Sequence, residues 1–263
     1  MADRLIPLKK YGQNFLKDGN IIRKIIDEIK PAKDETILEI GPGEGALTEY
    51  LVKGCTNFYT IEIDPRAIEH LRIKFESLRI LEGNFLKTDL LKLFPGNHKI
   101  RIAGNIPYNI TKAIIIKLLD NRELLQDAVL MVQHEVAEKL TSSAGDDDYG
   151  VLAVLMNYFT ETKICFTVPP TVFYPKPKVS SAVIHITFKP ECRLEQNFDN
   201  ELFIKLVNSA FANRRKTLKN SLSNSIFGHY DLSLSGIDLS GRAEQMSVTD
   251  FIKLTRAVLE QRK

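Results

Sequence analysis

A glycine-rich turn and a later glutamate have the types and spacing to bind a nucleoside. Gly41-Pro42-Gly43-Glu44-Gly45-Ala46 lies between an expected strand, Thr36 to Ile40, and an expected helix. Glycine at such a turn lets the backbone bend tightly and approach a ligand closely. Glu62 ends the next expected strand, 19 residues after Gly43, where it could accept hydrogen bonds from ribose hydroxyls. The spacing also fits G-x-G-x-x-A, so by itself it leaves a dinucleotide cofactor open.

The tetrapeptide Asn105-Ile106-Pro107-Tyr108 narrows the choice of cofactor and of reaction. It follows the expected strand Lys99 to Ala103 and therefore lies at the same sheet edge as the glycine turn. It resembles the Asn/Asp-Pro-Pro-Tyr/Phe motif of S-adenosylmethionine-dependent methyltransferases that act on amino groups of bases. Such an amine is a poor nucleophile because its lone pair is delocalised into the ring. Acceptors that draw on its hydrogens favour a more pyramidal nitrogen, and an aromatic ring can hold the base by stacking.

Three further segments extend the resemblance over nearly the whole chain. They are Gly12-Gln13-Asn14-Phe15-Leu16, Val168 to Val179 (VPPTVFYPKPKV) and Phe211 to Leu218 (FANRRKTL). Together with the tetrapeptide they resemble the small-subunit ribosomal RNA adenine dimethyltransferases, the enzymes whose loss gives kasugamycin resistance in bacteria. The resemblance implies a class I methyltransferase fold and S-adenosyl-L-methionine as cofactor. It also implies dimethylation of N6 on two adjacent adenosines near the 3′ end of small-subunit ribosomal RNA, within an assembling small subunit.

The resemblance assigns roles to individual residues. The implied cofactor-binding residues are Asn14, Leu16, Gly41, Gly43, Glu62, Asn84 and Asn105, and the implied catalytic residues are Asn105, Ile106, Pro107, Tyr108 and Phe173. Asn14 and Leu16 would close over the methionine end of the cofactor, and Glu62 would bind its ribose. Phe173 would cover the second face of the target adenine. Asn84 stands where the family usually has an Asp that contacts the cofactor's adenine amine, and its amide oxygen can still accept a hydrogen bond.

Strand and helix patterns alternate from about residue 19 to residue 141, which predicts the elements that position these residues. This alternation is typical of a parallel sheet covered on both faces, with ligands beyond the carboxyl ends of its strands. Lys163 to Val168 and Ser180 to Phe188 read as two strands without a crossover helix, so we expect an antiparallel end to the sheet. We therefore predict an α/β, Rossmann-like methyltransferase domain over residues 1–190 and a small all-α domain over residues 191–263.

The basic segment Arg214-Arg215-Lys216-Thr217-Leu218 predicts contact with RNA. Lys and Arg outnumber Asp and Glu by ten to six from Glu201 to Lys263. We expect one helix to run through the segment, and Arg214 falls within the apolar stripe of that helix. We therefore expect Arg214 to be partly buried and paired with a carboxylate. Arg215, Lys216 and Lys219 are then the expected phosphate contacts.

Composition excludes several classes of protein. With 263 residues, 44% hydrophobic and 26% charged, the chain is too apolar for a disordered protein. No apolar run approaches the roughly 20 residues of a membrane helix, and the N-terminus lacks a signal-peptide core. Three separated cysteines without a C-x-x-C pair indicate a reduced, metal-free cytoplasmic protein. We expect a monomer.

Two other functions are compatible with parts of the sequence. The large-subunit ribosomal RNA adenine methyltransferases that confer macrolide resistance have similar glycine and Asn-Ile-Pro-Tyr motifs, but the RRKTL segment argues against them. A ribosome-assembly or transcription factor could keep the fold and bind RNA without essential catalysis. Intact Asn105 and Tyr108 argue against that loss of activity.

Overall fold

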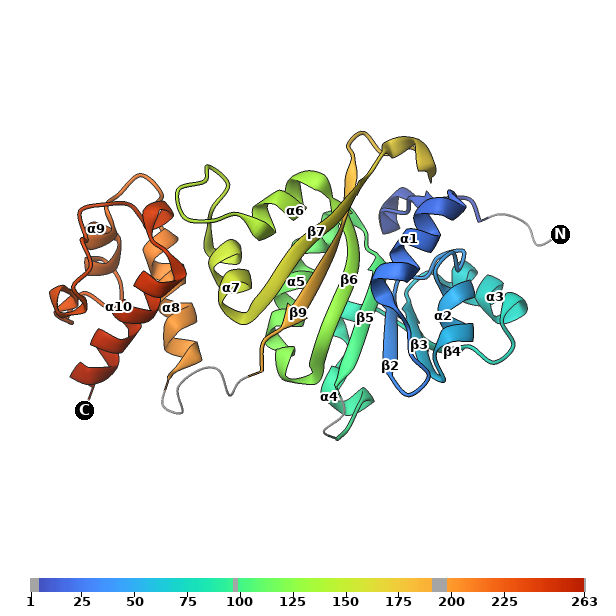
Figure 1. The fold of residues 1–263 in the computed structure, drawn as a ribbon, viewed down its shortest axis with the longest axis horizontal. Helices are drawn as coiled ribbons and strands as arrows, with labels where there is room; N and C mark the ends of the chain where they lie inside the picture. The colour runs from blue at the N-terminus through green and yellow to red at the C-terminus, as the bar shows by residue number, and fades with distance from the viewer. Residues whose placement is uncertain (1–4, 97–98, 191–197, 263) are drawn as a thin grey trace. The chain divides into compact units, whose positions relative to one another are not determined.

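A seven-stranded sheet carries the residues of interest. The computed structural model describes residues 5–96, 99–190 and 198–262. The strand order is β4-β3-β2-β5-β6-β9-β7 (Figure 1), and the strands are β2 Thr36–Ile40, β3 Asn57–Glu62, β4 Arg79–Glu82, β5 Ile100–Asn105, β6 Leu125–Gln133, β7 Thr160–Val168 and β9 Ser181–Phe188. Strands β4, β3, β2, β5 and β6 pair with their neighbours in parallel, and β9 pairs antiparallel to β6. The predicted mostly parallel sheet with an antiparallel end strand is confirmed.

A separate two-stranded sheet pairs the N-terminal segment with the excursion before β9. It consists of β1 Phe15–Leu16 and β8 Phe173–Tyr174, which run antiparallel. The helices are α1 Gly19–Ile29, α2 Thr48–Gly54, α3 Pro65–Lys74, α4 Leu90–Leu93, α5 Thr111–Asp120, α6 His134–Thr141, α7 Val151–Phe159, α8 Asn200–Phe211, α9 Leu218–Ser223 and α10 Val248–Gln261. Among the helices of the described residues, none is long and apolar enough to cross a membrane.

Helix starts and apolar faces follow local sequence signals. Asp18 caps α1 by accepting from the backbone N–H groups of Asn20 and Ile21. Asp64 caps α3, and Pro65 occupies its first position, where a missing N–H costs nothing. The apolar stripe of α1 packs with residues of β2, β5 and β6 in a buried cluster. On the other side of the sheet lies α5 (Figure 1), so both faces are covered.

The chain divides into two compact units. One comprises the chain up to Ala137 together with Thr162–Phe188, and the other comprises Glu138–Glu161 and the chain from Lys189 onward. The second unit thus contains α7 as well as the three C-terminal helices. There Tyr158 of α7 stacks on Phe203 of α8, with ring centroids 4.1 Å apart. We predicted a domain boundary between residues 190 and 191. In the structure α7 comes before that boundary but belongs to the same compact unit as the helices after it. The predicted division into domains stays a prediction.

A buried ion network joins three strands of the sheet. Arg101 of β5 donates from Nε and Nη2 to the Asp127 carboxylate of β6, each at 2.7 Å, and from Nη1 to Glu35 at 2.7 Å. His185 of β9 lies 2.8 Å from the same carboxylate through Nε2. Burial raises the pKa of Asp127, but hydrogen bonds from His185 and Arg101 outweigh it and hold the pKa below its ordinary value. The sequence pattern predicts a strand only over Ala128 to Val132, and β6 is longer because Asp127 is satisfied inside the sheet.

We predict that Arg101→Leu lowers the free energy of unfolding by about 3–5 kcal/mol, because it leaves a buried carboxylate without its main partner. The pKa of Asp127 is depressed in the folded state, so its stabilisation exists above the unfolded pKa and is lost as the pH falls through the folded pKa. The variant should therefore lose less stability on acidification than the parent. Denaturant titrations from pH 7 down to pH 3 measure both effects.

The matched control is Arg72→Leu, since Arg72 pairs with Glu82 on the surface, where the two side chains are 60% and 54% exposed. Such pairs contribute about 0–1 kcal/mol. Equal losses in the Arg101 and Arg72 variants would show that the buried network does not stabilise the sheet.

Candidate cofactor and methyl-acceptor site

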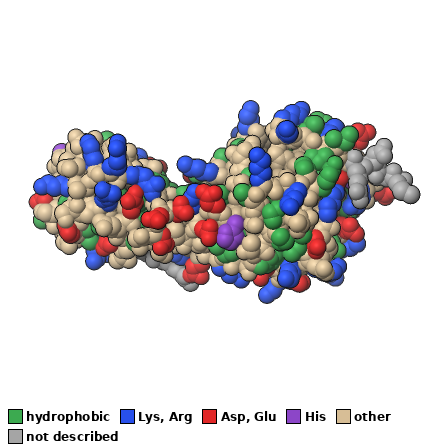
Figure 2. Space-filling model, turned by 90° about the horizontal axis from the view of Figure 1, so that it is seen from above, with side chains coloured by type: hydrophobic (Ala, Val, Ile, Leu, Met, Phe, Trp, Pro, Cys, Tyr) green, Lys and Arg blue, Asp and Glu red, His purple; other side chains and the backbone are tan. Residues whose placement is uncertain are grey.

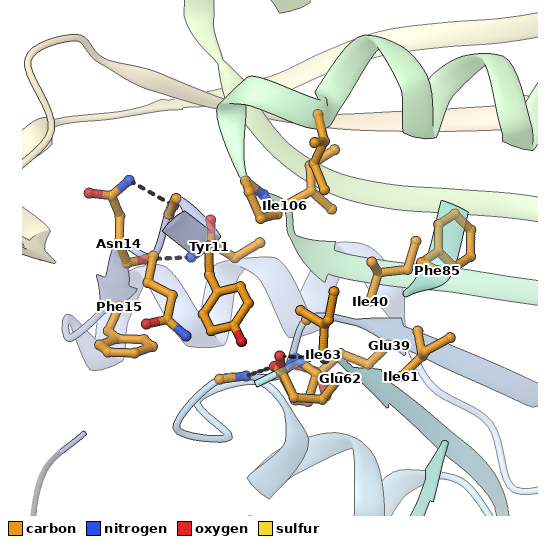
Figure 3. Close-up of a pocket in the computed structure, with 18 of the residues that line it drawn as sticks. Tyr11, Asn14, Phe15, Glu39, Ile40, Ile61, Glu62, Ile63, Phe85 and Ile106 are labelled. Carbon is orange, nitrogen blue, oxygen red and sulfur yellow. Dashed lines mark hydrogen bonds between the residues drawn. The ribbon is translucent and has the colours of Figure 1, made fainter. Parts of the chain in front are cut away.

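One cavity of about 260 Å³ lies at the carboxyl ends of the parallel strands (Figure 3). Its walls come from the loops after β2, β3, β4 and β5 and from the N-terminal segment. The structure brings nearly all the predicted site residues to this cavity: Asn14, Leu16, Gly41, Gly43, Glu62, Asn84, Asn105, Ile106, Pro107 and Tyr108. The cavity thus lies where the strand order reverses between β2 and β5, the usual ligand position in such sheets.

Gly104 allows the ends of β2 and β5 to approach each other. A Cβ on Gly104 would lie 2.7 Å from the Ile40 carbonyl oxygen, a backbone atom that cannot move aside easily. Only glycine fits such a close approach without strain. The absence of a side chain here sets Asn105 next to the glycine turn that begins at Gly41.

The glycine turn leaves backbone open to the cavity. Gly41 has φ +65°, a left-handed conformation that favours glycine, and a Cβ there would meet nothing within 4 Å. Gly43 has φ +56°, and a Cβ there would lie 2.9 Å from the Phe15 ring. The aromatic ring of the N-terminal segment therefore packs directly on the turn.

Backbone N–H groups fix Glu62 as a hydrogen-bond acceptor. Its Oε1 accepts from Ile63 at 2.8 Å and from Asp64 at 2.9 Å, and its Oε2 accepts from Gly43 at 3.1 Å (Figure 3). Burial raises the pKa of Glu62 above its ordinary value, and the three backbone donors oppose that shift. The carboxylate is thus held at the end of β3 in one orientation, with acceptor capacity left for ligand hydroxyls.

A second buried carboxyl, Glu39, was missed by our sequence reasoning. It lies in β2, lines the cavity, and accepts from Thr48 Oγ1 at 2.6 Å. Burial raises the pKa of Glu39 to about 8, the hydrogen bond from Thr48 opposes the shift, and nearby Glu62 adds to it. The available signal was a charged residue inside the otherwise apolar strand Thr36–Ile40.

Asn84 lines the cavity, but its amide oxygen already has a partner. Oδ1 accepts from the Leu86 backbone N–H at 2.9 Å and caps the short helical turn Phe85–Lys87. An amide oxygen has two lone pairs, so one remains for a ligand amine. Asn84 can therefore cap the turn and still accept a hydrogen bond from the amine of a base.

Two oxygen atoms that can accept hydrogen bonds lie at the end of β5. Asn105 donates from Nδ2 to the Asn14 carbonyl oxygen at 2.9 Å. Its Oδ1 and the Ile106 carbonyl oxygen receive no hydrogen bond from the part of the chain that the structure describes. Pro107 follows Ile106 with φ −61°, which fixes the carbonyl's direction. The tetrapeptide therefore offers two unfilled acceptors beside the cavity.

Of the two aromatic residues that we expected at the cavity, Tyr108 and Phe173, the structure places one there. Tyr108 lines it, and its hydroxyl lies 2.6 Å from Ser181 Oγ. Burial raises the pKa of Tyr108, so the phenol stays neutral. Phe173 is 5% exposed and packs in the core cluster instead. Pairing of β8 with β1 turns Phe173 inward and Tyr174 outward, so the structure does not bring Phe173 to the cavity, and its contact with the adenine stays a prediction.

Long-range hydrogen bonds hold the N-terminal segment over the cavity. Gln13 accepts from the Leu8 N–H and donates to Asp64 at the start of α3, both at 2.9 Å. Lys17 pairs with Glu44 of the glycine turn. The lining residues that were not predicted include Tyr11, Ile63 and Phe85. The available sequence signal for Ile63 was its place directly after Glu62 at the end of a strand.

The basic segment of the second unit lies where one helix ends and another begins. Helix α8 ends at Phe211, residues 212–216 form a turn and a bend, and Thr217 caps the new helix α9. Our assumption of one continuous helix was therefore wrong, and with it the partial burial of Arg214, whose side chain is 58% exposed.

The pairing of Arg214 with a carboxylate is confirmed. Its Nε donates to Glu244 at 2.8 Å, within the same unit, and Nη2 donates to the carbonyls of Asp147 and Tyr149. Arg215, Lys216 and Lys219 are all exposed. Their proposed contact with RNA remains a prediction.

The described residues contain no group of three or more His, Cys, Asp or Glu side chains that could hold a metal ion. The polar side chains that line the cavity include several carboxyls and amides, and Lys10 is the one Lys or Arg among the described lining residues. Such walls suit an uncharged or cationic ligand that offers hydrogen-bond donors.

Comparisons with known proteins agree with this geometry. Residues 8–259 match the family described as ribosomal RNA adenine dimethylase. The chain is 45% identical over 247 residues to the ribosomal RNA small subunit methyltransferase A of Chlorobium phaeobacteroides, covering 94% of this chain and 89% of that protein. It is 39% identical over 251 residues to the protein of the same description from Francisella tularensis subsp. novicida, covering 94% and 95%.

Two solved structures share the fold over nearly the full length. A dimethyladenosine transferase from Plasmodium falciparum superposes with a TM-score of 0.78 at 28% identity, covering 94% of this chain and 97% of that one. The 23S rRNA methyltransferase ErmE superposes with a TM-score of 0.72 at 27% identity, covering 93% and 99%. With the matched family spanning both units, the chain belongs to the ribosomal RNA adenine dimethylase family.

Proposed function

We propose that this chain transfers methyl groups from S-adenosyl-L-methionine to N6 of two adjacent adenosines near the 3′ end of small-subunit ribosomal RNA, during assembly of the small subunit. The observation that carries the proposal is the pair of unfilled acceptors, Asn105 Oδ1 and the Ile106 carbonyl, beside a cavity built for a nucleoside. The relatives described as small-subunit methyltransferases, at 39–45% identity over 94% of the chain, support the choice of substrate.

The cavity residues fit the proposed cofactor. The fixed carboxylate of Glu62 suits a ribose diol, and the open backbone at Gly41 allows close approach of the methionine portion. Asn84 and Ile63 lie where they could contact the adenine. Glu39 and Glu62 line the cavity, and a positively charged ligand beside them would favour their ionised forms. When bound, the cofactor would supply an electrophilic methyl group on a sulfonium sulfur.

The chain's own residues would prepare the adenine amine for attack. Asn105 Oδ1 and the Ile106 carbonyl would accept its two hydrogens, which draws electron density away from the N–H bonds and favours a pyramidal nitrogen. The Tyr108 ring would hold the base by stacking, and its bond to Ser181 fixes the ring. Catalysis would then come from positioning and polarisation.

Contacts outside the cavity would select the RNA. Arg215, Lys216 and Lys219 are exposed on the second unit and can approach phosphates. The likeness to the 23S rRNA methyltransferase ErmE keeps a large-subunit substrate as the second candidate. To test which RNA is the substrate, the protein is incubated with labelled cofactor and undermethylated small subunits in one reaction, and with labelled cofactor and large-subunit RNA in another. We expect label in the small-subunit RNA, as N6,N6-dimethyladenosine. Label only in the large-subunit RNA, or in neither, would refute the proposal.

We predict that Asn105→Ala lowers the rate of methyl transfer about 10²–10³-fold, the usual effect of removing one preorganised polar group. The sheet should persist, because among the described residues the side chain makes one hydrogen bond, to the Asn14 carbonyl, and that bond is not part of the sheet. Single-turnover kinetics with labelled cofactor measure the loss, and circular dichroism checks the fold. Turnover close to that of the parent would contradict the assignment.

We predict that Asn84→Asp keeps both the cap on Leu86 and the affinity for the cofactor, since a carboxylate accepts at least as well as an amide. Asn84→Leu should weaken cofactor binding by about 1–3 kcal/mol, the cost of leaving a ligand amine unpaired. Calorimetric titration of the three proteins compares their affinities. Because the Leu variant also loses a cap, its melting temperature must be measured. Unchanged affinity in a folded Leu variant would show that Asn84 does not touch the cofactor.

We predict opposite effects for the neighbouring residues Arg214 and Arg215. Arg214→Ala removes three hydrogen bonds within the second unit and should lower stability by about 1 kcal/mol. Arg215→Ala should shift stability by less than about 0.5 kcal/mol. It should, however, weaken binding to the small subunit and flatten its salt dependence, since each phosphate contact releases about one counterion.

Melting curves and salt-titrated binding make this comparison, with Lys253→Ala as a control for loss of one exposed cation from the same unit. If Arg215→Ala binds like the Lys253 variant, Arg215 does not contact the RNA.

A further inference from the structure

The loop from Tyr174 to Ser180 is tied at both of its ends to the acceptor tetrapeptide. At one end, Tyr174 pairs with Phe15 in the β1–β8 sheet, and the preceding Asn14 carbonyl accepts from Asn105. At the other end, Ser181 follows the loop and lies 2.6 Å from the Tyr108 hydroxyl. In Figure 1 this is the gold segment that leads into β9. The loop therefore flanks the place where the target adenosine would enter.

The side chains of this loop are exposed, aromatic and basic. Tyr174 is 60% exposed, whereas Phe173 beside it is 5% exposed, as the alternation of a strand requires. Lys176 and Lys178 are exposed, and neither has a carboxylate partner among the residues that the structure describes. Pro175 and Pro177 alternate with them and restrict the backbone. An exposed aromatic ring with two ammonium groups alongside is a combination that binds single-stranded nucleic acid.

Other cations lie beside the acceptor residues of the same unit. Lys10 lines the cavity and its Nζ lies 4.6 Å from the centre of the Tyr11 ring. Lys112 is exposed in the first turn of α5, four residues after Tyr108. Figure 2 shows Lys and Arg side chains, with hydrophobic side chains among them, on the viewed face of this unit. The loop thus continues a positive, partly aromatic rim.

We propose that the loop binds the single-stranded RNA that flanks the target adenosine. Tyr174 stacks on the base next to the one that enters the cavity, and Lys176 and Lys178 contact the adjoining phosphates. This proposal rests on the proposed function, and it adds an RNA surface on the sheet unit to the basic segment of the second unit. It also gives the exposed ring of Tyr174 a role that its place outside the core does not provide.

Three variants test the loop: Tyr174→Ala, Tyr174→Phe and the double variant Lys176→Ala/Lys178→Ala. Binding to undermethylated small ribosomal subunits is measured over a range of salt concentrations, and KM and kcat are measured for methyl transfer. Tyr174→Ala should weaken binding roughly 5- to 150-fold, the usual effect of losing one base stack, while Tyr174→Phe stays close to the parent. The double variant should reduce the slope of log K against log salt by about 0.7 for each lost contact to a single strand.

The matched control is Lys33→Ala/Lys53→Ala, which removes two exposed lysines near the amino ends of β2 and β3, opposite the cavity. This control should bind RNA like the parent. All variants should keep the parent's melting temperature and its affinity for S-adenosyl-L-methionine, so the change appears in KM for RNA.

Binding and salt slopes of the loop variants that equal those of the control would overturn the proposal. A parent chain that binds small subunits without methylating them would instead refute the proposed function. The binding comparison would then still decide whether the loop contacts RNA.

Discussion

The hydrogen bond from Asn105 Nδ2 to the Asn14 carbonyl, 2.9 Å long, determines which side of the amide a substrate can meet. With the nitrogen engaged, the oxygen is left as the acceptor, which is the atom needed to draw on an amine hydrogen. The same bond holds the N-terminal segment against the end of β5. Phe15, two residues from Gln13 and directly after Asn14, then packs on Gly43. One interaction thus orients the acceptor and closes the cavity wall.

Buried carboxyl groups impose the second constraint on the site. Three backbone N–H groups donate to Glu62 and oppose the rise in its pKa that burial causes. Glu39 has one side-chain donor, and its pKa of about 8 keeps it mostly neutral near pH 7. Burial raises the pKa of both groups, and a positively charged ligand beside them would lower it again.

Local sequence signals predicted much of the sheet unit. The cap at Asp18, the proline after Asp64 and the glycine turn at Gly41 each set an element boundary through interactions of a few neighbouring residues. The strand Thr36–Ile40 has the predicted bounds. By contrast, β6 is longer than predicted, because Asp127 finds partners on other strands that no local pattern reveals.

The structure departs from the sequence-based expectations where tertiary pairing overrides a local pattern. The register of β8 against β1 places Phe173 in the core, which the sequence Val168 to Val179 does not encode by itself. The helical wheel through Arg214 failed because the chain leaves α8 at Phe211. Thr217, a good cap residue directly before Leu218, was a local signal for that break. Lining residues such as Tyr11 depend on contacts across the fold.

A crystal structure of the chain with S-adenosylhomocysteine and a short adenosine-containing RNA tests the central claim most directly. The account predicts that Asn105 Nδ2 remains on the Asn14 carbonyl. Asn105 Oδ1 and the Ile106 carbonyl should then lie within about 2.7–3.2 Å of the adenine N6. An adenine N6 that meets neither oxygen, or an Asn105 amide that has left Asn14, would contradict the account.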